Sequence, residues 1–173
     1  MQRTTPSTVG RLLEEAWPQA YRIAWTILRD PTDAEDAAQE ACARALRASD
    51  SLRNAGAFRS WFYRIVVNEA RARLRRRTHD AIVDEPRVPF ESPDERIDVA
   101  RAIEKLDDHA RLVILLFYYV ELSTAEIAHV MGSSPLAVRL RLLAARRRLR
   151  PLLTADESAP IVERTASEPQ AAK

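Results

Sequence analysis

The sequence predicts an all-α protein made of two small helical domains joined by a flexible acidic linker, with the second domain ending in a helix-turn-helix. Apolar residues recur at helical spacing along most of the 173 residues, without the long alternation that is typical of strands. Glycine occurs only 3 times, whereas the helix-favouring residues Ala, Leu, Arg and Glu dominate. We therefore expect domains at 10–77 and 96–153, a linker at 78–95 and a disordered tail at 154–173.

Composition and motif content exclude several classes of protein. The longest apolar run, Leu112 to Val120, is too short to cross a bilayer, and the N-terminus lacks a signal pattern, so we expect a cytoplasmic protein. Cys42 is the single cysteine and is interpreted as a small core residue, and the three histidines are too scattered to predict a metal site. Because no nucleophile–base spacing or phosphate-binding glycine loop is present, we expect no enzyme, no cofactor and no small-molecule substrate.

The first helix is predicted over 10–28, where apolar residues recur every three or four positions. Pro18 should kink or split this helix, because proline removes one backbone hydrogen bond. Trp17, Tyr21 and Trp25 share one face, and an aromatic stripe of this kind usually packs in a core.

The second helix is predicted to begin at Asp33, after a turn at 29–31, and the carboxylate suits the positive end of the helix dipole. Its apolar positions are small, mostly alanines. The polar residues Asp36, Gln39 and Glu40 fall on a different side. They form either a solvated face or a docking surface for a basic partner, and periodicity does not separate these two interpretations.

The third helix is predicted to begin at Phe58, after a loop at 49–56. Its core face has i, i+3, i+4, i+7 spacing and consists of Phe58, Trp61, Phe62, Ile65 and Val66. A second face carries long donors and one amide, namely Arg64, Asn68, Arg71 and Arg75. That face fits a phosphate backbone or a nucleic-acid groove, and a solvated arginine face is the alternative.

The second half of the chain predicts a helix at 97–106 and another that Asp107 and Asp108 cap. The latter helix contains Val113 to Val120, which is apolar nearly all round. It is therefore predicted to form the centre of a second core.

Residues 123–150 have the outline of a helix-turn-helix. Ser123 and Glu126 have the spacing of a capping box, Gly132 follows a short helical pattern, and Ser134-Pro135 begins the next helix. This last helix contains six arginines and no acid. The alternative is an ordinary helical hairpin with a solvated arginine face.

The net charge of +2 conceals a strong grouping of charges. Residues 58–77 contain seven arginines and one glutamate, whereas 78–100 contain seven acids and two arginines. Two basic helices separated by an acidic connector indicate two contacts with one polyanion. Arginine also suits bidentate contacts with phosphate and guanine.

Three stretches resemble bacterial RNA polymerase sigma factors of the extracytoplasmic-function (ECF) type. Residues 30–40, DPTDAEDAAQE, match the family's DxxDAEDxxQE signature in region 2.2. Residues 58–68, FRSWFYRIVVN, and the arginine-rich run that follows match the FxxWLxxIxxN…RR pattern of regions 2.3 and 2.4. Residues 106–150 are similar to region 4. The three stretches occur in the family's order and at its spacing.

The resemblance implies a first domain that binds the clamp helices of the polymerase β′ subunit and melts the −10 promoter element. It implies a second domain that reads the −35 element and contacts the β flap, and it makes an anti-sigma factor a further expected partner. The implied polymerase contacts are Asp36, Gln39 and Glu40. The implied −10 contacts are Asn54, Arg64, Asn68, Arg71 and Arg75. The implied −35 contacts are Ser134, Arg139, Arg141 and Arg146.

The chain departs from the family pattern in its second domain. Glu121 stands where the family usually has glycine, and Leu140, Leu143 and Ala144 stand where it usually has Ser, His and Arg. Three polar groups that could face DNA are absent, so −35 reading is expected to be weaker, different, or partly replaced by shape readout and thymine-methyl contacts. Two alternatives stay open: a helix-turn-helix regulator that acts without the polymerase, and a degenerate sigma-like module that sequesters a partner.

Overall fold

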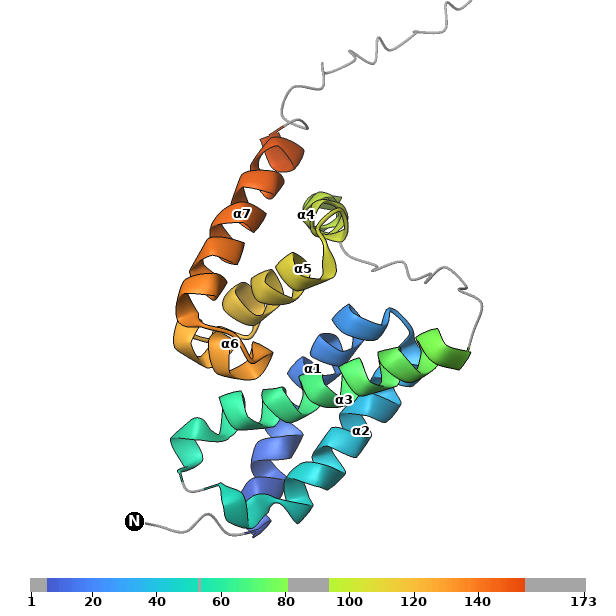
Figure 1. Cartoon of the computed structure of the whole chain (residues 1–173), viewed down its shortest axis with the longest axis vertical. Helices are drawn as coiled ribbons and strands as arrows, with labels where there is room; N and C mark the ends of the chain where they lie inside the picture. The colour runs from blue at the N-terminus through green and yellow to red at the C-terminus, as the bar shows by residue number, and fades with distance from the viewer. Residues whose placement is uncertain (1–5, 53, 81–93, 155–173) are drawn as a thin grey trace, which may run out of the picture.

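The computed structural model describes residues 6–52, 54–80 and 94–154 (Figure 1). The predicted tail apart from Thr154, and the predicted linker apart from its two ends, lie outside the described residues. The elements are α1 (Pro6–Leu28), α2 (Pro31–Arg47), the 3-10 turns η1 (Ser49–Ser51) and η2 (Ala55–Ala57), α3 (Phe58–Asp80), α4 (Asp94–Glu104), α5 (Asp108–Ile114), the π-helical turn η3 (Leu115–Tyr119), α6 (Thr124–Met131) and α7 (Pro135–Thr154). The described residues contain helices and no strand, which confirms the all-α prediction.

Helix α1 is longer than the sequence pattern predicts and is not split at Pro18. Proline leaves the carbonyl of Glu14 without its helical partner, and Glu14 lies on the exposed side of the helix, where water can take that bond. Trp17, Tyr21 and Trp25 are half-buried and pack against the core rather than forming its centre.

Helix α2 lies close to α1 and α3 because its inner side is built from alanine. The buried alanines are Ala34, Ala37, Ala38, Ala41 and Ala45, none more than 2% exposed. The helix begins at Pro31, two residues earlier than predicted, because the Asp30 side chain accepts a 2.8 Å hydrogen bond from the Asp33 N–H. Cys42 is half-buried, and burial raises the pKa of its thiol. The thiol therefore stays uncharged, which agrees with its interpretation as a small packing residue.

Helix α3 is buried over a wider arc than its predicted core face. Phe58, Phe62 and Val66 are buried as expected, but Tyr63 and Val67 are buried too. The reason is tertiary, because α3 packs against α1 and α2 on the one hand and against α6 of the second half on the other. Burial also raises the pKa of the Tyr63 hydroxyl.

The second core is centred on α5 and its π-helical extension η3, with Val113 and Leu116 fully buried. This confirms the predicted centre of the second core, although the burial does not extend all round, since Tyr118 is 56% and Tyr119 is 42% exposed. Arg111 lies inside this core at 9% exposure, and its Nη2 donates to the carbonyls of Glu104 and Leu106 at 2.9 and 2.8 Å. These bonds satisfy the otherwise unpaired carbonyls at the end of α4.

The helix-turn-helix is confirmed in its details. The Ser123 hydroxyl accepts from the Glu126 N–H while the Glu126 carboxylate accepts from the Ser123 N–H at 2.8 Å, which is a complete capping box. Gly132 adopts φ 65° at the end of α6. The Ser134 hydroxyl then accepts a 3.2 Å bond from Ala137, and α7 begins at Pro135.

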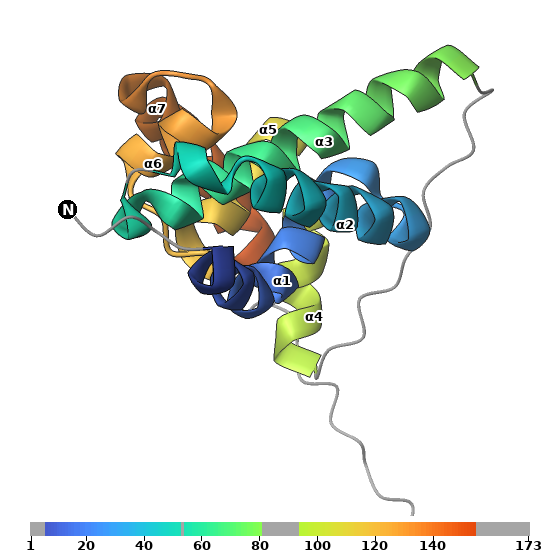
Figure 2. The same cartoon turned by 90° about the horizontal axis from the view of Figure 1, so that it is seen from below.

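The two halves of the chain pack together instead of standing apart. Helix α6 lies against α3, and α5 contacts α1 (Figures 1 and 2). Arg22 stacks over the Tyr119 ring at 4.4 Å, and Arg59 donates to the Val120 carbonyl. The end of η3 is therefore fixed against the first three helices by two arginines.

Glu121 adopts a left-handed conformation, φ 57°, directly after η3. The chain reverses there, and the Leu122 N–H bonds back to the Leu116 carbonyl at 3.0 Å. This conformation disfavours residues with a Cβ atom, and a glycine would adopt it without strain.

We expect Glu121→Gly to raise the free energy of unfolding by about 0.5–1 kcal/mol, because the relief of left-handed strain exceeds the extra freedom of glycine in the unfolded chain. Urea denaturation of the full chain measures the change. Glu121→Ala is the control, since it removes the carboxylate and keeps the strain. An equal gain from Ala would contradict the backbone explanation.

Candidate nucleic-acid interface and the neighbouring acidic groove

The basic face of α3 is placed as predicted, opposite the buried side of the helix. Arg64, Asn68 and Arg75 are exposed, and Arg71 is half-buried. Four residues at this spacing recur on one side of a helix, so they can follow one strand of a polyanion.

The second half of the chain lies beside this face. Arg64 Nη1 is 3.4 Å from Nδ1 of His129 on α6. Burial lowers the pKa of the Arg71 guanidinium, and the like charges of Arg141 on α7 and of Arg75 lower it further. The positive charge of Arg141 on α7 therefore acts on Arg71 of α3, and a bound anion would relieve this repulsion.

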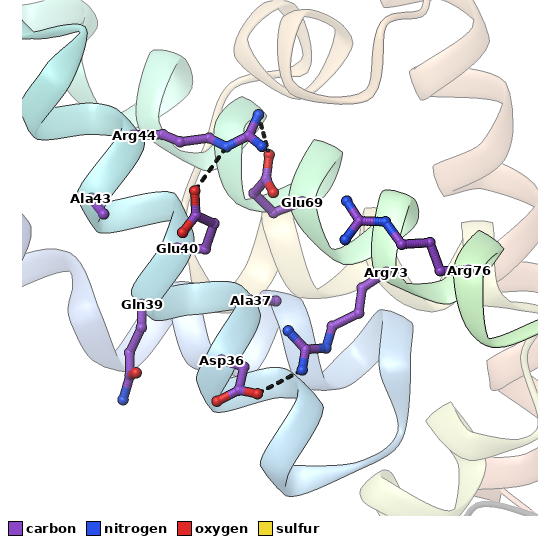
Figure 3. Close-up of a pocket in the computed structure, with 9 residues that line it drawn as sticks. All are labelled: Asp36, Ala37, Gln39, Glu40, Ala43, Arg44, Glu69, Arg73 and Arg76. Atoms are coloured by element: carbon purple, nitrogen blue, oxygen red, sulfur yellow. Dashed lines mark hydrogen bonds and ion pairs between the residues drawn. The ribbon is translucent and has the colours of Figure 1, made fainter.

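An acidic and basic groove of about 570 Å³ separates α2 from α3 on another side of the molecule (Figure 3). The residues that line it are Asp36, Ala37, Gln39, Glu40, Ala43, Arg44, Glu69, Arg73 and Arg76. Two of the three predicted polymerase-binding residues, Asp36 and Glu40, hold ion pairs here, whereas the Gln39 side chain points out of the groove in Figure 3.

Ion pairs join the two walls of the groove. Arg73 reaches Asp33 at 2.7 Å and Asp36 at 2.6 Å, and these carboxylates raise the pKa of its guanidinium. Arg44 bridges Glu40 at 3.2 Å and Glu69 at 2.9 Å. Three arginines thus balance the three acids that line the groove and hold the acidic side chains of α2 in place.

Glu40 remains fully ionised at neutral pH. Its hydrogen bond from Arg44, and the further bond and charge of Arg47, lower the pKa of the Glu40 carboxyl. A negative group at the rim of the groove suits a basic partner surface.

Sequence reasoning missed three members of this network: Asp33, Glu69 and Arg73. The i, i+4 spacing of Glu40 and Arg44 indicates their pair, but the pairs between α2 and α3 depend on how the two helices pack. Periodicity contains no signal for that register.

Asn54 is exposed and serves as the N-cap of η2, where its side chain accepts a 2.9 Å bond from the Gly56 N–H. The side-chain oxygen Oδ1 of Asn54 is therefore engaged within the loop. The amide nitrogen stays available for a base or a phosphate.

The four predicted −35 residues do not share one face of α7. Ser134 and Arg139 are exposed, and Arg141 is half-buried. Arg146 is held within its own half, because its Nε donates to the Tyr118 hydroxyl at 2.8 Å.

No helix among the described residues combines the length and the apolar character that a membrane span needs. Within the same ranges, His, Cys, Asp and Glu side chains form no group of three that could hold a metal ion.

Comparison with known proteins matches both halves of the chain to one family. The model of Sigma-70 region 2 matches residues 12–79, and that of Sigma-70, region 4 matches residues 96–149. The RNA polymerase sigma factor SigV of Bacillus subtilis is 27% identical over 161 residues, which cover 90% of this chain and 97% of that protein. The ECF RNA polymerase sigma factor SigM of Mycobacterium tuberculosis is 33% identical over 140 residues, covering 78% and 71% respectively.

A solved structure of CnrH in complex with the cytosolic domain of CnrY is also similar. It has a TM-score of 0.63 and 30% identity, and the match covers 88% of this chain and 91% of CnrH. The two family matches thus define a two-part, DNA-directed subunit of the transcription machinery.

The chain belongs to the sigma-70 family, and within it to the ECF sigma factors. Its function is that of a promoter-specificity subunit of bacterial RNA polymerase. The match to region 2 disfavours the alternative of a regulator that acts without the polymerase.

We expect Arg44→Met to lower the free energy of unfolding by about 1–3 kcal/mol, because it leaves the Glu69 carboxylate without its ion-pair partner. The Glu69 side chain is only 10% exposed, so water does not replace the lost partner. Thermal and urea denaturation measure the loss.

Arg47→Met is the matched control, since Arg47 pairs only with the exposed Glu40 and should cost less than about 0.5 kcal/mol. Equal losses in the two variants would show that the Arg44–Glu69 pair contributes no more to the free energy of unfolding than the exposed Arg47–Glu40 pair.

Proposed function

We propose that this sigma subunit binds polymerase through the polar face of α2 and promoter DNA through α3 and α7. Residues 10–77 bind core polymerase through Asp36, Gln39 and Glu40 on α2, and contact the −10 element through Asn54 and the basic face of α3. Residues 96–153 contact the −35 element through α7. The chain acts in the cytoplasm with the polymerase, which supplies all catalysis.

The observation that carries the proposal is that α2 and α3 present opposite chemistry on adjoining surfaces. The ion pairs of Arg73 with Asp36 and of Arg44 with Glu40 fix acidic residues of α2 on the groove side. The cations Arg64 and Arg75 of α3 lie on the side away from the core. One short bundle can therefore bind a basic protein surface and a nucleic-acid strand at the same time.

Run-off transcription tests this function directly. Purified core polymerase with the full chain should produce discrete transcripts from a genomic fragment library, and core polymerase alone should not. The absence of any chain-dependent transcript would overturn the proposal.

We expect Gln39→Arg to weaken core-polymerase binding at least tenfold, because a cation on the α2 surface repels a basic partner. Gln39 bonds only to Glu35 on the same helix, at 3.2 Å, so the ion pairs between α2 and α3 stay intact. Asp36→Arg should weaken binding further. Co-purification with tagged core polymerase and a binding titration measure both effects.

Glu14→Arg is the control, because Glu14 is an exposed acid on α1 and its substitution changes the charge by the same amount as Asp36→Arg. If Glu14→Arg weakens binding as much as Asp36→Arg, the net charge rather than the α2 face determines the interaction.

DNA contact by α3 requires that α6 and α7 move away. His129 Nδ1 lies 3.4 Å from Arg64 Nη1, and the charge of Arg141 on α7 acts on Arg71. A −10 strand that follows Arg64, Asn68 and Arg71 would compete with these side chains for the same space. Repulsion between the like charges of Arg71 and Arg141 opposes the packing of the two halves, and their separation by the polymerase would relieve it.

We expect a cleavable bis-maleimide link between Arg64→Cys and His129→Cys to abolish promoter opening in a chain whose Cys42 is replaced by alanine. Cleavage of the linker should restore it. Permanganate reactivity of promoter thymines in the holoenzyme measures opening. The same double variant without linker controls for the substitutions, and full opening by the linked chain would contradict the proposed motion.

An anti-sigma factor is a further proposed partner. The similar CnrH was solved in complex with the cytosolic domain of CnrY. A partner that holds α6 against α3 would prevent Arg64 and Arg71 from contacting DNA. It would not need to act on the catalytic site of the polymerase.

A further inference from the structure

Three leucines of α7 lie exposed in a row. Leu136 is 62%, Leu140 is 58% and Leu143 is 45% exposed. Single exposed leucines are ordinary, but three on one side of one helix form an apolar surface that water solvates poorly. We refer to Leu136, Leu140 and Leu143 as the leucine face.

The leucine face points directly away from the core of the second half. At roughly 100° per residue, its members lie opposite the buried side of α7. That buried side consists of Val138, Leu142 and Ala145, none more than 3% exposed. The leucine face is therefore on the outer side of the second helix of the helix-turn-helix, which is the side that enters a major groove.

The charges around the leucine face favour a polyanion over a protein helix. Helix α7 carries six arginines and no acid. Arg139 lies within the row and Arg147 continues it, and both are exposed. Phosphates on either side of a groove match these cations, and the groove floor must then offer apolar atoms to the leucines.

We propose that the leucine face reads the −35 element through thymine C5-methyl groups, so that this sigma factor selects a thymine-containing −35 segment. The proposal rests on the function proposed above and specifies the chemistry of its −35 contact. The methyl group is the apolar feature that a base pair presents in the major groove. Burial of one such group against leucine strengthens binding about fourfold.

The experiment uses holoenzyme made from the full chain and core RNA polymerase. A pool of duplexes with a randomised upstream segment is selected for binding, and an enriched duplex is then prepared with deoxyuridine in place of each thymidine in turn. Uracil keeps the O4 acceptor and lacks only the methyl group. We expect thymine to be enriched in the −35 segment, and each contacted position to lose about fourfold in affinity with uracil.

The triple variant Leu136→Ala, Leu140→Ala, Leu143→Ala should bring the thymine-to-uracil affinity ratio close to one at the same positions. Leu153→Ala is the matched control, because Leu153 is a 38% exposed leucine at the far end of α7. It should retain the ratio. Because the readout is a ratio between two DNAs, a general loss of stability does not mimic the effect, and circular dichroism checks the helix content.

Equal binding of thymine and uracil by a holoenzyme that does enrich a sequence would overturn the inference and leave the proposed function standing. It would assign the leucine face to a protein partner, such as an acidic amphipathic helix. A ratio that persists in the triple variant would overturn the inference as well. A holoenzyme that enriches no sequence would overturn both this inference and the proposed function.

Discussion

Helix α3 is the element on which the rest of the structure depends, because it must be buried on one side and strongly cationic on the other. Phe58, Phe62 and Val66 supply the core of the first half. The alanines of α2 allow the close approach that this burial needs. Arginines of α3 that face α2 pair with its carboxylates, as Arg73 does, whereas Arg64 and Arg75 on the opposite side are exposed to water. The residues of α3 thus determine both the packing of the first half and the candidate DNA surface.

The same constraint explains why the two halves pack together. Helix α3 offers a surface that α6 covers, and Arg59 and Arg22 fix the end of η3 through a carbonyl and an aromatic ring. The buried apolar residues of the two halves belong to one hydrophobic cluster, and the contacts of Arg59 and Arg22 add to it. Phosphates of DNA would offer the arginines of α3 charge-assisted hydrogen bonds in place of these contacts.

Periodicity and capping chemistry could predict the helices from the sequence, since the capping box at Ser123 and the left-handed Gly132 depend on local residues alone. The shared face of Arg64 and Asn68 follows from helical spacing in the same way. Contacts between elements could not be predicted, because they depend on helix packing: Arg44 with Glu69, and Arg64 with His129. The residue-specific DNA and polymerase contacts stay predictions.

The central claim is that the basic face of α3, whose Arg64 lies against His129 of α6 in the free chain, is the face that contacts promoter DNA. Spin labels on exposed Asp50 and Ala125 of a chain without Cys42 measure this directly, with a second pair on Glu35 and Ala125. Pulsed electron paramagnetic resonance would compare the free chain with the holoenzyme on promoter DNA. The account predicts a short, narrow distance distribution in the free chain and a clearly longer distance in the complex for both pairs. Unchanged distances in the complex would contradict it.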